Sequence, residues 1–437
     1  MVEWSEVTVD KIASSARNAL VGGPFGSNLV SRDYSEHGVP VIRGQNMGQR
    51  WVGGGFVYVT PAKAKSLESN IARPGDVVFT QRGTLGQVSI IPEEPFDQYL
   101  ISQSQMKLTV DREVVDPLFI YYVFRSEQLQ DYIRQQSIQT GVPHTNLAIL
   151  RSTPILLPPL PDQLAIVHIL GPLDDKIELN QQMNKTLEAI GQAAFKHWFI
   201  DFEFPNEEGE PYKSSGGEMV YNEELGKEIP KGWRVERLGN LLKSLETGRR
   251  PKGGIDQTLR DGIPSIGAEN INGLGFYDYS STKYISQEYF EQMKQGIVKD
   301  KDVLLYKDGA QLGRKTIFGE GFPFITCCVN EHVFILRGNE ELNQLFLYFW
   351  LDQNEITENI KNLNANSAQP GINKESLGTL EVLVPRRYLL DDFEGMLDSV
   401  FDKLFLNCLE ARNLSQIRDS LLPKLMSGKI RVSLEVR

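Results

Sequence analysis

Asp175-Lys-Ile-Glu-Leu-Asn180 recurs as Asp402-Lys-Leu-Phe-Leu-Asn407, 227 residues further along the chain. From position 175 to 190, 6 of 16 residues are identical to their counterparts at this offset, whereas ordinary residue usage would give about one. Shorter matches extend outward from this repeat at offsets between 224 and 229: Trp4 with Trp233, Gly38 with Gly262, Asp76 with Asp302, Leu85 with Leu312, and Asn146 with Asn373. We infer that the chain is one module built twice.

The repeated stretch lies in two segments whose apolar residues alternate at spacings of three and four. This seam contains Leu173, Ile177, Asn180, Leu187, Val400, Leu404, Asn407 and Leu414. The spacing is typical of a coiled coil, so we expect two long helices, within residues 156–204 and 385–437, that pair with each other. Asn180 and Asn407 hold equivalent positions, where a buried Asn can fix register at some cost in stability. The alternative is that each helix is an ordinary core helix packed against its own domain.

A segment of short β-rich runs precedes each helix. Residues 1–155 alternate β-branched and aromatic runs with Gly and Pro turns, and residues 233–384 repeat the plan. Each segment also contains one apolar stretch, at 116–125 and 341–350, that predicts a helix. The expected fold class is therefore α+β, with two pseudo-repeated β-rich domains and two long helices. Residues 205–232, acidic and rich in Gly and Pro, are interpreted as the linker.

The charge distribution permits a nucleic-acid partner but does not require one. The chain has 437 residues and a net charge of −11. Residues 156–230 carry 5 basic and 14 acidic side chains, whereas 1–155 carry 14 and 15, and 231–384 carry 18 and 20. The two globular segments are thus nearly neutral and can hold local basic patches. Three cysteines and the absence of a signal-peptide pattern or a long apolar run predict a cytoplasmic protein without membrane contact.

A search for catalytic patterns finds none that is complete. Gly309-Ala-Gln-Leu-Gly313-Arg-Lys315 is similar to a phosphate-binding loop, but three residues separate its glycines where four are needed, and Arg314 precedes the lysine. The five histidines and three cysteines lack metal-ligand spacing, and no nucleophile elbow or methyltransferase motif occurs. The Asp174–Lys176 triplet is interpreted as a salt-bridged helix surface. We therefore expect no catalytic residue, cofactor or metal site in this chain.

The motifs together resemble one family, the specificity subunits of type I restriction–modification enzymes. The most specific are Leu157-Pro-Pro-Leu-Pro-Asp-Gln163, which leads into Leu173-Asp-Asp-Lys-Ile177, and Glu224-Leu-Gly-Lys-Glu-Ile-Pro-Lys-Gly-Trp233, which opens the second half. Arg82-Gly-Thr-Leu-Gly86 and Gly141-Val-Pro-His-Thr-Asn-Leu147 are similar to loop motifs of the family. The second half departs from the pattern, because Pro385-Arg-Arg-Tyr replaces the proline-rich entry to the helix.

The resemblance implies both an architecture and a set of partners. Residues 1–155 and 233–384 would be target recognition domains that each read one half of an asymmetric, split sequence in double-stranded DNA. The two helices would pack antiparallel as spacers. Two modification (methyltransferase) subunits and the restriction (nuclease–translocase) subunits would bind this chain. S-adenosylmethionine, ATP and Mg would belong to those partner subunits, and this chain would be non-catalytic.

Candidate DNA-reading residues are loop side chains that can pair with base edges or phosphates. In the first half they are Arg43, Gln45, Asn46, Arg82, Thr84, His144, Thr145 and Asn146. In the second half they are Arg249, Arg250, Lys252, Lys307, Gln311, Arg314, Lys315, Asn366 and Gln369. Each could instead be an ordinary solvated loop residue or a turn former.

Two other functions remain open from the sequence. One keeps the fold without DNA and makes the chain a two-headed scaffold that binds proteins. The other makes it a DNA methyltransferase or nuclease whose catalytic motifs have diverged. Binding to DNA that requires both halves favours the specificity subunit, and methyl transfer by the isolated chain would favour the enzyme.

Overall fold

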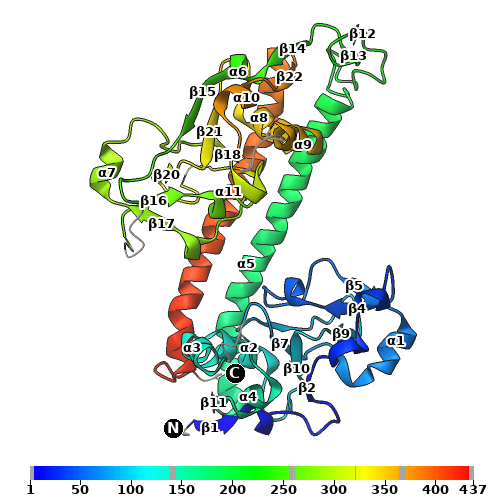
Figure 1. Ribbon diagram of the computed structural model, residues 1–437, viewed down its shortest axis with the longest axis vertical. Coiled ribbons are helices and arrows are strands. Elements are labelled where there is room, and N and C mark those ends of the chain that lie inside the picture. The colour runs from blue at the N-terminus through cyan, green and yellow to red at the C-terminus, as the bar shows by residue number, and fades with distance from the viewer. Residues whose placement is uncertain are drawn as a thin grey trace. The chain divides into compact units, whose positions relative to one another are not determined.

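The computed structural model describes residues 4–137, 144–254, 259, 261–319, 321–363 and 371–432. The chain divides into two compact units, Met1–Asp175 with Leu414–Arg437, and Lys176–Asn413. Each unit contains one β-rich domain, called a head below, and part of both long helices (Figure 1).

The first head is built on two sheets and a two-stranded ribbon. The pairing is antiparallel throughout the described strands except between β4 and β9. In spatial order the four-stranded sheet is β2 (Leu20–Gly22), β10 (Gln105–Leu108), β7 (Val77–Thr80) and β8 (Val88–Ile90). The five-stranded sheet is β3 (Tyr34–Ser35), β5 (Val57–Val59), β4 (Val39–Ile42), β9 (Tyr99–Ile101) and β6 (Ile71–Ala72), and the ribbon is β1 (Ser5–Thr8) with β11 (Pro154–Leu157).

The described residues of the first head form four α-helices, of which the sequence predicted one, at 116–125. They are α1 (Pro61–Ser66), α2 (Pro117–Arg125), α3 (Glu127–Gln136) and α4 (Leu147–Ser152). Asp116 caps α2, because its carboxylate accepts the backbone N–H groups of Leu118 and Phe119. Pro117 occupies the first helical position, where a missing N–H costs nothing.

The second head repeats the four-stranded sheet and the ribbon, whereas its other sheet has three strands in place of five. Its four-stranded sheet is β15 (Leu242–Thr247), β21 (Val333–Gly338), β18 (Val303–Tyr306) and β19 (Lys315–Ile317). The smaller sheet is β17 (Lys283–Ile285), β16 (Ile263–Ile266) and β20 (Cys328–Val329), with β16 and β20 parallel like β4 and β9. The ribbon is β14 (Arg234–Arg237) with β22 (Glu381–Val384), and the helices are α6 (Leu238–Leu241), α7 (Gln287–Glu291), α8 (Gln344–Asp352), α9 (Asn354–Asn362) and α10 (Lys374–Gly378).

Several sequence matches between the halves mark backbone positions that allow little choice. Gly38 and Gly262 have φ angles of 134° and 140°, and a Cβ on either would lie 2.2 or 2.4 Å from a carbonyl oxygen of the neighbouring strand. Asp76 accepts the N–H of the residue three positions earlier, and so does Asp302. The predicted duplication is therefore present in the three-dimensional structure, although the heads share little sequence.

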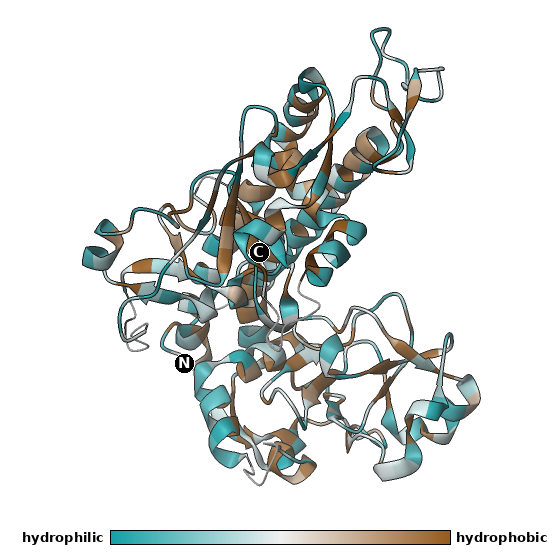
Figure 2. Cartoon of the chain, turned by 45° about the horizontal axis from the view of Figure 1, so that its top comes forward, coloured by the Kyte–Doolittle hydropathy of each residue, from teal (hydrophilic) through white to brown (hydrophobic). Residues whose placement is uncertain are grey.

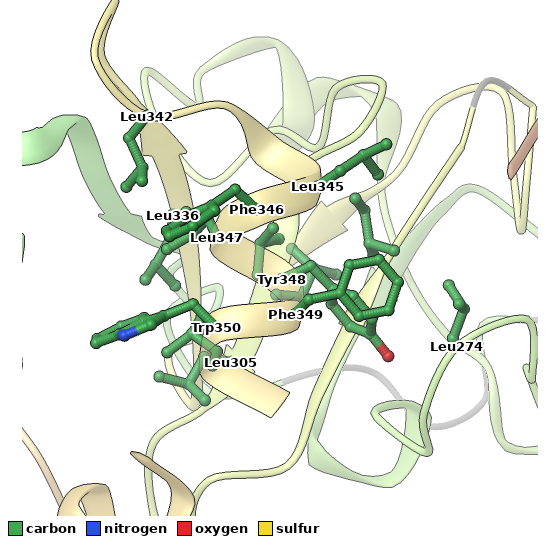
Figure 3. Packing of buried hydrophobic residues seen from close by; sticks show 14 of the residues in the cluster. Leu274, Leu305, Leu336, Leu342, Leu345, Phe346, Leu347, Tyr348, Phe349 and Trp350 are labelled. Carbon is green, nitrogen blue, oxygen red and sulfur yellow. The ribbon is translucent and has the colours of Figure 1, made fainter. Parts of the chain in front are cut away.

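The core of the second head surrounds α8. All residues from Leu345 to Leu351 are buried, so this apolar run is a core helix (Figure 3). The strands β18 and β21 that pack near it are also mostly hydrophobic (Figure 2). Among the described residues, no helix is both long and apolar enough to cross a membrane.

The two long helices are α5 (Leu160–Phe195), which continues as a π-helical turn over Lys196–Ile200, and α11 (Arg387–Met426). Within the second unit they run antiparallel, because Lys176 lies 3.2 Å from Glu410 whereas Asn184 bonds to the carbonyl of Leu404. The predicted α+β class with two long antiparallel helices is thus confirmed.

The seam positions differ in how deeply they are buried. Ile177, Leu404, Asn180 and Asn407 are buried, whereas Leu173, Leu187, Val400 and Leu414 are half-buried. Asn180 donates to the carbonyl of Asn407 and to Glu410, and Asn407 donates to Asn184. The carbonyl oxygens of the Asn180 and Asn407 side chains are buried without a hydrogen-bond partner.

Different residues fasten the start of each long helix to its head. Gln163, fully buried, accepts the N–H of Asp116 and donates to the carbonyls of Val114 and Pro158. In the second head Asn343, the cap of α8, donates instead to the carbonyl of Leu390 in α11. In the second half the Asn343–Leu390 bond takes over the role of Gln163, so α11 does not need the Pro-Asp-Gln sequence that begins α5.

The segment interpreted as a linker contains regular structure in the second unit. Strands β12 (Met219–Asn222) and β13 (Lys227–Pro230) form an antiparallel hairpin. Before it, the Phe204 ring stacks on Tyr212 and Trp233, with centroid distances of 4.5 and 5.3 Å. Trp233, the residue that opens the second half, thus anchors this segment to its core.

Candidate nucleic-acid interface

The strand directions gather several loops at one edge of each four-stranded sheet. Because neighbouring strands alternate in direction, the chain leaves β2 and β7 and enters β10 and β8 at the same edge. The second head does the same with β15, β18, β21 and β19. Together with segments 43–49, 144–146 and 267–273, which hydrogen-bond to these loops, we call them the first loop edge (residues 23–29, 43–49, 81–87, 102–104 and 144–146) and the second loop edge (residues 248–254, 267–273, 307–314 and 330–332).

The first loop edge brings together candidates that lie far apart in sequence. Arg82 forms an isolated β-bridge with His144, and the Thr145 N–H bonds to the carbonyl of Gln81 at 3.0 Å. Gln87 donates to the carbonyl of Met47 at 2.8 Å, which ties the 43–49 loop to the 81–87 loop. Arg82, Thr84 and Gln45 are exposed, whereas Arg43 and His144 are half-buried and Thr145 is buried.

Two asparagine candidates of the first head hold backbone in place. Asn46 is buried, accepts the N–H of Arg43 and donates to the carbonyls of Gly53 and Gly55. Asn146 caps α4 by accepting the N–H of Ile149 at 2.9 Å, as Asn373 caps α10 at its Ser376 N–H. These bonds give both side chains a structural role, and their contact with DNA stays a prediction.

The second loop edge carries a charged cluster after β15. Arg249 and Lys252 are exposed. Arg250 lies 2.5 Å from the Glu331 carboxylate and 2.8 Å from Nε2 of His332. His332 in turn lies 2.8 Å from Asp308 through Nδ1. This chain of contacts restrains Arg250, so it is presented to solvent with less freedom than its neighbours.

The polar side chains of the 307–315 segment differ in exposure. Gln311 and Arg314 are exposed, and Arg314 donates to the side chain of Asn272 at 2.9 Å. Lys307 is half-buried, with Nζ 5.2 Å from the Phe334 ring centroid.

Lys315 points into the fold. Its ammonium donates to the carbonyl of Leu351 at the end of α8 and to the hydroxyl of Thr357. Burial lowers the pKa of this lysine. The ammonium group is thus already engaged within the protein. Asn366 and Gln369 lie outside the described residues.

Two contacts that position the loop edges were not found from the sequence. Ser89 donates to the carbonyl of Gln49 and Thr316 to that of Gly273, both at 2.8 Å. A Cβ on Gly23 would lie 1.9 Å from the carbonyl oxygen of Ser102, and one on Gly248 would lie 1.5 Å from that of Val329. A glycine directly after a β-rich run was the available signal.

The described residues do not bring potential metal ligands together. They contain no group of three or more metal-ligating side chains of His, Cys, Asp or Glu. All three cysteines are buried, and burial raises the pKa of Cys408 to about 12.

Comparison with known proteins gives a consistent result over the whole chain. The Type I restriction modification DNA specificity domain matches residues 29–189 and again residues 230–387. The type I restriction enzyme MjaIX specificity subunit of Methanocaldococcus jannaschii is 27% identical over 94% of this chain and 91% of its own. The HindI specificity subunit of Haemophilus influenzae is 24% identical over 92% and 97%.

A solved structure supports the fold. The type I restriction-modification system S subunit from M. genitalium aligns with a TM-score of 0.54 and 17% identity, covering 97% of this chain and 96% of that one. The family domain also occurs twice, at positions that overlap the two heads. The chain therefore belongs to the type I restriction–modification DNA specificity family and carries its specificity domain in two copies.

Proposed function

We propose that each loop edge reads one half of a bipartite, asymmetric DNA target for a type I restriction–modification complex. The observation that carries this is one scaffold bearing two different sets of loop side chains. The first loop edge exposes Arg82, Thr84 and Gln45, whereas the second exposes Arg249, Gln311 and Arg314. Equal scaffolds with unequal hydrogen-bonding groups suit two different half-sites.

The exposed side chains have the chemistry of base readers. Arg pairs in a bidentate manner with guanine and Gln with adenine in the major groove. The restrained Arg250 suits a base contact, because a side chain that is already ordered loses less entropy on binding. The freer Arg249 and Lys252 suit phosphate contacts.

The long helices suit a spacer between the half-sites. At about 1.5 Å per residue, the 36 residues of α5 rise about 54 Å and the 40 of α11 about 60 Å. Half-sites on one face of DNA recur about every 34 Å. A stiff helix pair would set such a separation more narrowly than a flexible linker.

Two equivalent grooves support the binding of two copies of one partner, the modification subunit. The first groove, of about 370 Å³, is lined by Val123, Leu129, Tyr132, Leu156 and Met426 among others. The second groove, of about 670 Å³, is lined by Trp350, Ile356, Asn359, Leu383 and Phe199 among others. These five pairs are related by the offset of 227, so the grooves occupy equivalent places in the two units.

Each groove also combines an end of one long helix with the head of the other repeat. Met426 belongs to α11 but lines the groove of the first unit, and Phe199 follows α5 but lines that of the second. Duplicated sites on one chain suit two copies of a single protein. In this proposal the partners supply S-adenosylmethionine, ATP and Mg chemistry, and this chain is non-catalytic.

Selection from random duplex DNA tests the proposal. The chain, assembled with its modification subunits, should enrich two short sequence blocks separated by a constant number of unread base pairs. Affinity should fall with salt, as contacts to phosphates require. Enrichment of no sequence would favour the protein scaffold, and methyl transfer by the isolated chain would favour the enzyme.

A further inference from the structure

A buried ionic cluster joins three segments of the first unit. The Tyr122 hydroxyl of α2 donates to Oδ2 of Asp174 in α5 at 2.8 Å, and Arg418 of α11 donates to Oδ1 at 2.6 Å. Asp174 is only 4% exposed. Burial and the Asp174 charge raise the pKa of Tyr122, so this hydroxyl stays a donor.

The same three positions meet in the second unit with different chemistry. At the offset of 227, Tyr122 corresponds to Phe349, Asp174 to Phe401, and Arg418 to Gly191. The rings of Phe349 and Phe401 lie 5.8 Å apart, and a Cβ on Gly191 would lie 2.3 Å from the edge of the Phe349 ring. The Phe401 ring thus takes the place of the Asp174 carboxylate. Gly191 takes the place of Arg418, and its lack of a side chain leaves room for the Phe349 ring.

Each long helix could also pair with the same helix of a second copy of the chain. If α5 paired with a second α5, the position of Arg418 would be filled by Gly191. The Asp174 carboxylate would then be buried against a residue without a side chain. If α11 paired with a second α11, the guanidinium of Arg418 would face Phe401.

The other described contacts between the helices discriminate less. Asn180 and Asn407 are counterparts, so an Asn would still face an Asn in either like pairing. Asn184, which accepts from Asn407, has Ala411 as its counterpart, so this one bond would be lost between two α11 helices but kept between two α5 helices. Leu187 and Leu414 are likewise identical counterparts. The Lys176–Glu410 pair is lost between two α5 helices, but both side chains are well exposed, and such pairs contribute little.

We propose that the Tyr122–Asp174–Arg418 cluster selects pairing of α5 with α11 of the same chain over pairing of like helices between copies. A buried ion pair adds little net stability, yet leaving one of its charges unpaired is costly. The cluster therefore destabilises a wrong helix pairing more than it stabilises the right one, and such a difference in free energy is what gives specificity. The proposal holds whether or not the heads read DNA.

Cysteine cross-linking of the full chain tests this proposal. In like pairing of α5, position 176 of one copy would face position 183 of the other, because Met183 is the counterpart of Glu410. Chains carrying Lys176→Cys and Met183→Cys should give almost no disulfide-linked dimer. Adding Tyr122→Phe, Asp174→Phe and Arg418→Gly gives both units the same three residues, and the dimer fraction should rise by about tenfold or more.

A milder variant covers the case in which that chain does not fold. Asp174→Asn with Arg418→Gln removes both charges at nearly constant volume, and it should raise the dimer fraction in the same direction. Lys301→Gln with Asp398→Asn is the matched control, because it neutralises the 2.7 Å pair between the second head and α11. A folded variant that keeps the original dimer fraction, or a control that raises it equally, would overturn the proposal.

Discussion

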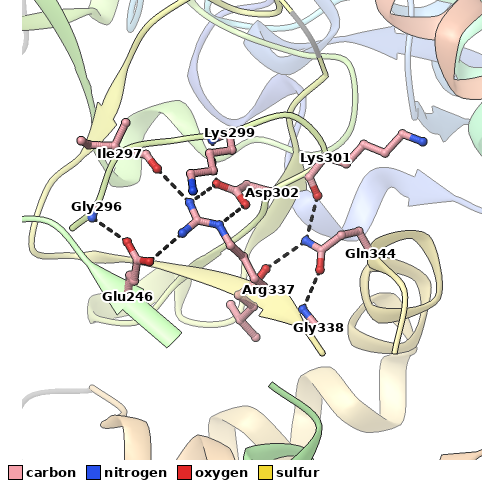
Figure 4. A network of polar contacts seen from close by, with 10 residues as sticks. Glu246, Gly296, Ile297, Lys299, Lys301, Asp302, Arg337, Gly338 and Gln344 are labelled. Atoms are coloured by element: carbon pink, nitrogen blue, oxygen red, sulfur yellow. Dashed lines mark hydrogen bonds and ion pairs between the residues drawn. The ribbon is translucent and has the colours of Figure 1, made fainter. Parts of the chain in front are cut away.

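The two heads share the strand order of their four-stranded sheets but pair the equivalent buried aspartates, Asp76 and Asp302, with different cations. In the first, Lys107 on β10 lies 3.0 Å from Asp76, which also accepts the Thr109 hydroxyl. In the second, Arg337 on β21 bonds to both oxygens of Asp302, to Glu246 and to the carbonyl of Ile297 (Figure 4). The two cations come from different positions of equivalent strands. The register pairs Val77 with Leu108 and Val303 with Leu336, so Arg337 corresponds to Thr109 and not to Lys107.

The comparison shows which properties survive duplication. The aspartate is kept because it also holds the backbone of its turn, through the N–H of Arg73 in one head and of Lys299 in the other. The cation differs both in type and in its position on the strand, because lysine and arginine each neutralise a carboxylate but bond differently. Backbone geometry is therefore retained more strictly than side-chain pairing.

Removal of Arg337 should cause the largest loss of stability. Arg337→Ala leaves Asp302 and Glu246 without their shared cation, so we expect a cost of about 3–5 kcal/mol in free energy of unfolding. Lys107→Ala should cost less, because Asp76 keeps the Thr109 hydroxyl and a backbone N–H. Urea denaturation of each variant measures the difference, and equal losses would contradict it.

The Arg337 variant should also change how stability depends on pH. Burial already raises the pKa of Asp302 despite the nearby arginine, and removing the cation should raise it further. The folded state then binds a proton more tightly than the unfolded state, so stability falls as pH rises through this range. The variant should therefore lose more stability at pH 7 than at pH 5, and the opposite trend would contradict this account.

Much of the fold was predictable because its signals are local. The apolar stretch at 116–125 coincides closely with α2 (Pro117–Arg125). The Asp174–Arg418 pair was not predictable, because 244 residues separate its members and the counterparts of both have other chemistry. The repeated plan of the heads was predicted from their apolar runs and turns, but their shared strand order was not, since most equivalent positions hold different side chains.

Substitution of Gly23 or Gly248, the two glycines where a loop edge passes close to neighbouring backbone, should cause the next-largest loss of stability. Gly23→Ala and Gly248→Ala would each force a Cβ against a backbone carbonyl that cannot move aside, so we expect a loss of about 1–3 kcal/mol. Gly44 is the matched control, because a Cβ there meets no atom within 4 Å, and Gly44→Ala should stay within about 0.5 kcal/mol. Thermal melting compares the three, and a neutral Gly248→Ala would contradict the close approach.

The candidate site was predicted only in part, because the same side chains read bases and stabilise turns. Arg82 and Arg314 are exposed as a reading role requires, whereas Lys315 bonds inward to the end of α8. Sequence gives the residue type but not the direction of the side chain. Asn146 and Asn373 carried a usable signal, since an Asn that precedes a helix in both halves indicates a cap.

Substitutions at the two exposed arginines should separate the heads functionally. Arg82→Ala should relax the preferred sequence in one block of the target and Arg314→Ala in the other, each costing about 1–3 kcal/mol of specific binding. Their stabilities should change by less than about 0.5 kcal/mol. Lys315→Met should instead lower stability, because it removes the bonds to Leu351 and Thr357. Relaxation of the same block by both arginine variants would refute one reader per head.

Substitutions at Asn146 have the smallest expected effect and decide whether that residue is a cap or a reader. Asn146→Ala and Asn373→Ala should each cost about 1 kcal/mol, the usual value of a lost cap. Asn146→Asp keeps an acceptor for the Ile149 N–H but removes the amide donors that adenine recognition needs. If capping is its only role, the Asp variant keeps both stability and sequence preference. If Asn146 also contacts a base, stability is kept while specific binding weakens, and a binding titration beside a melting curve distinguishes the two.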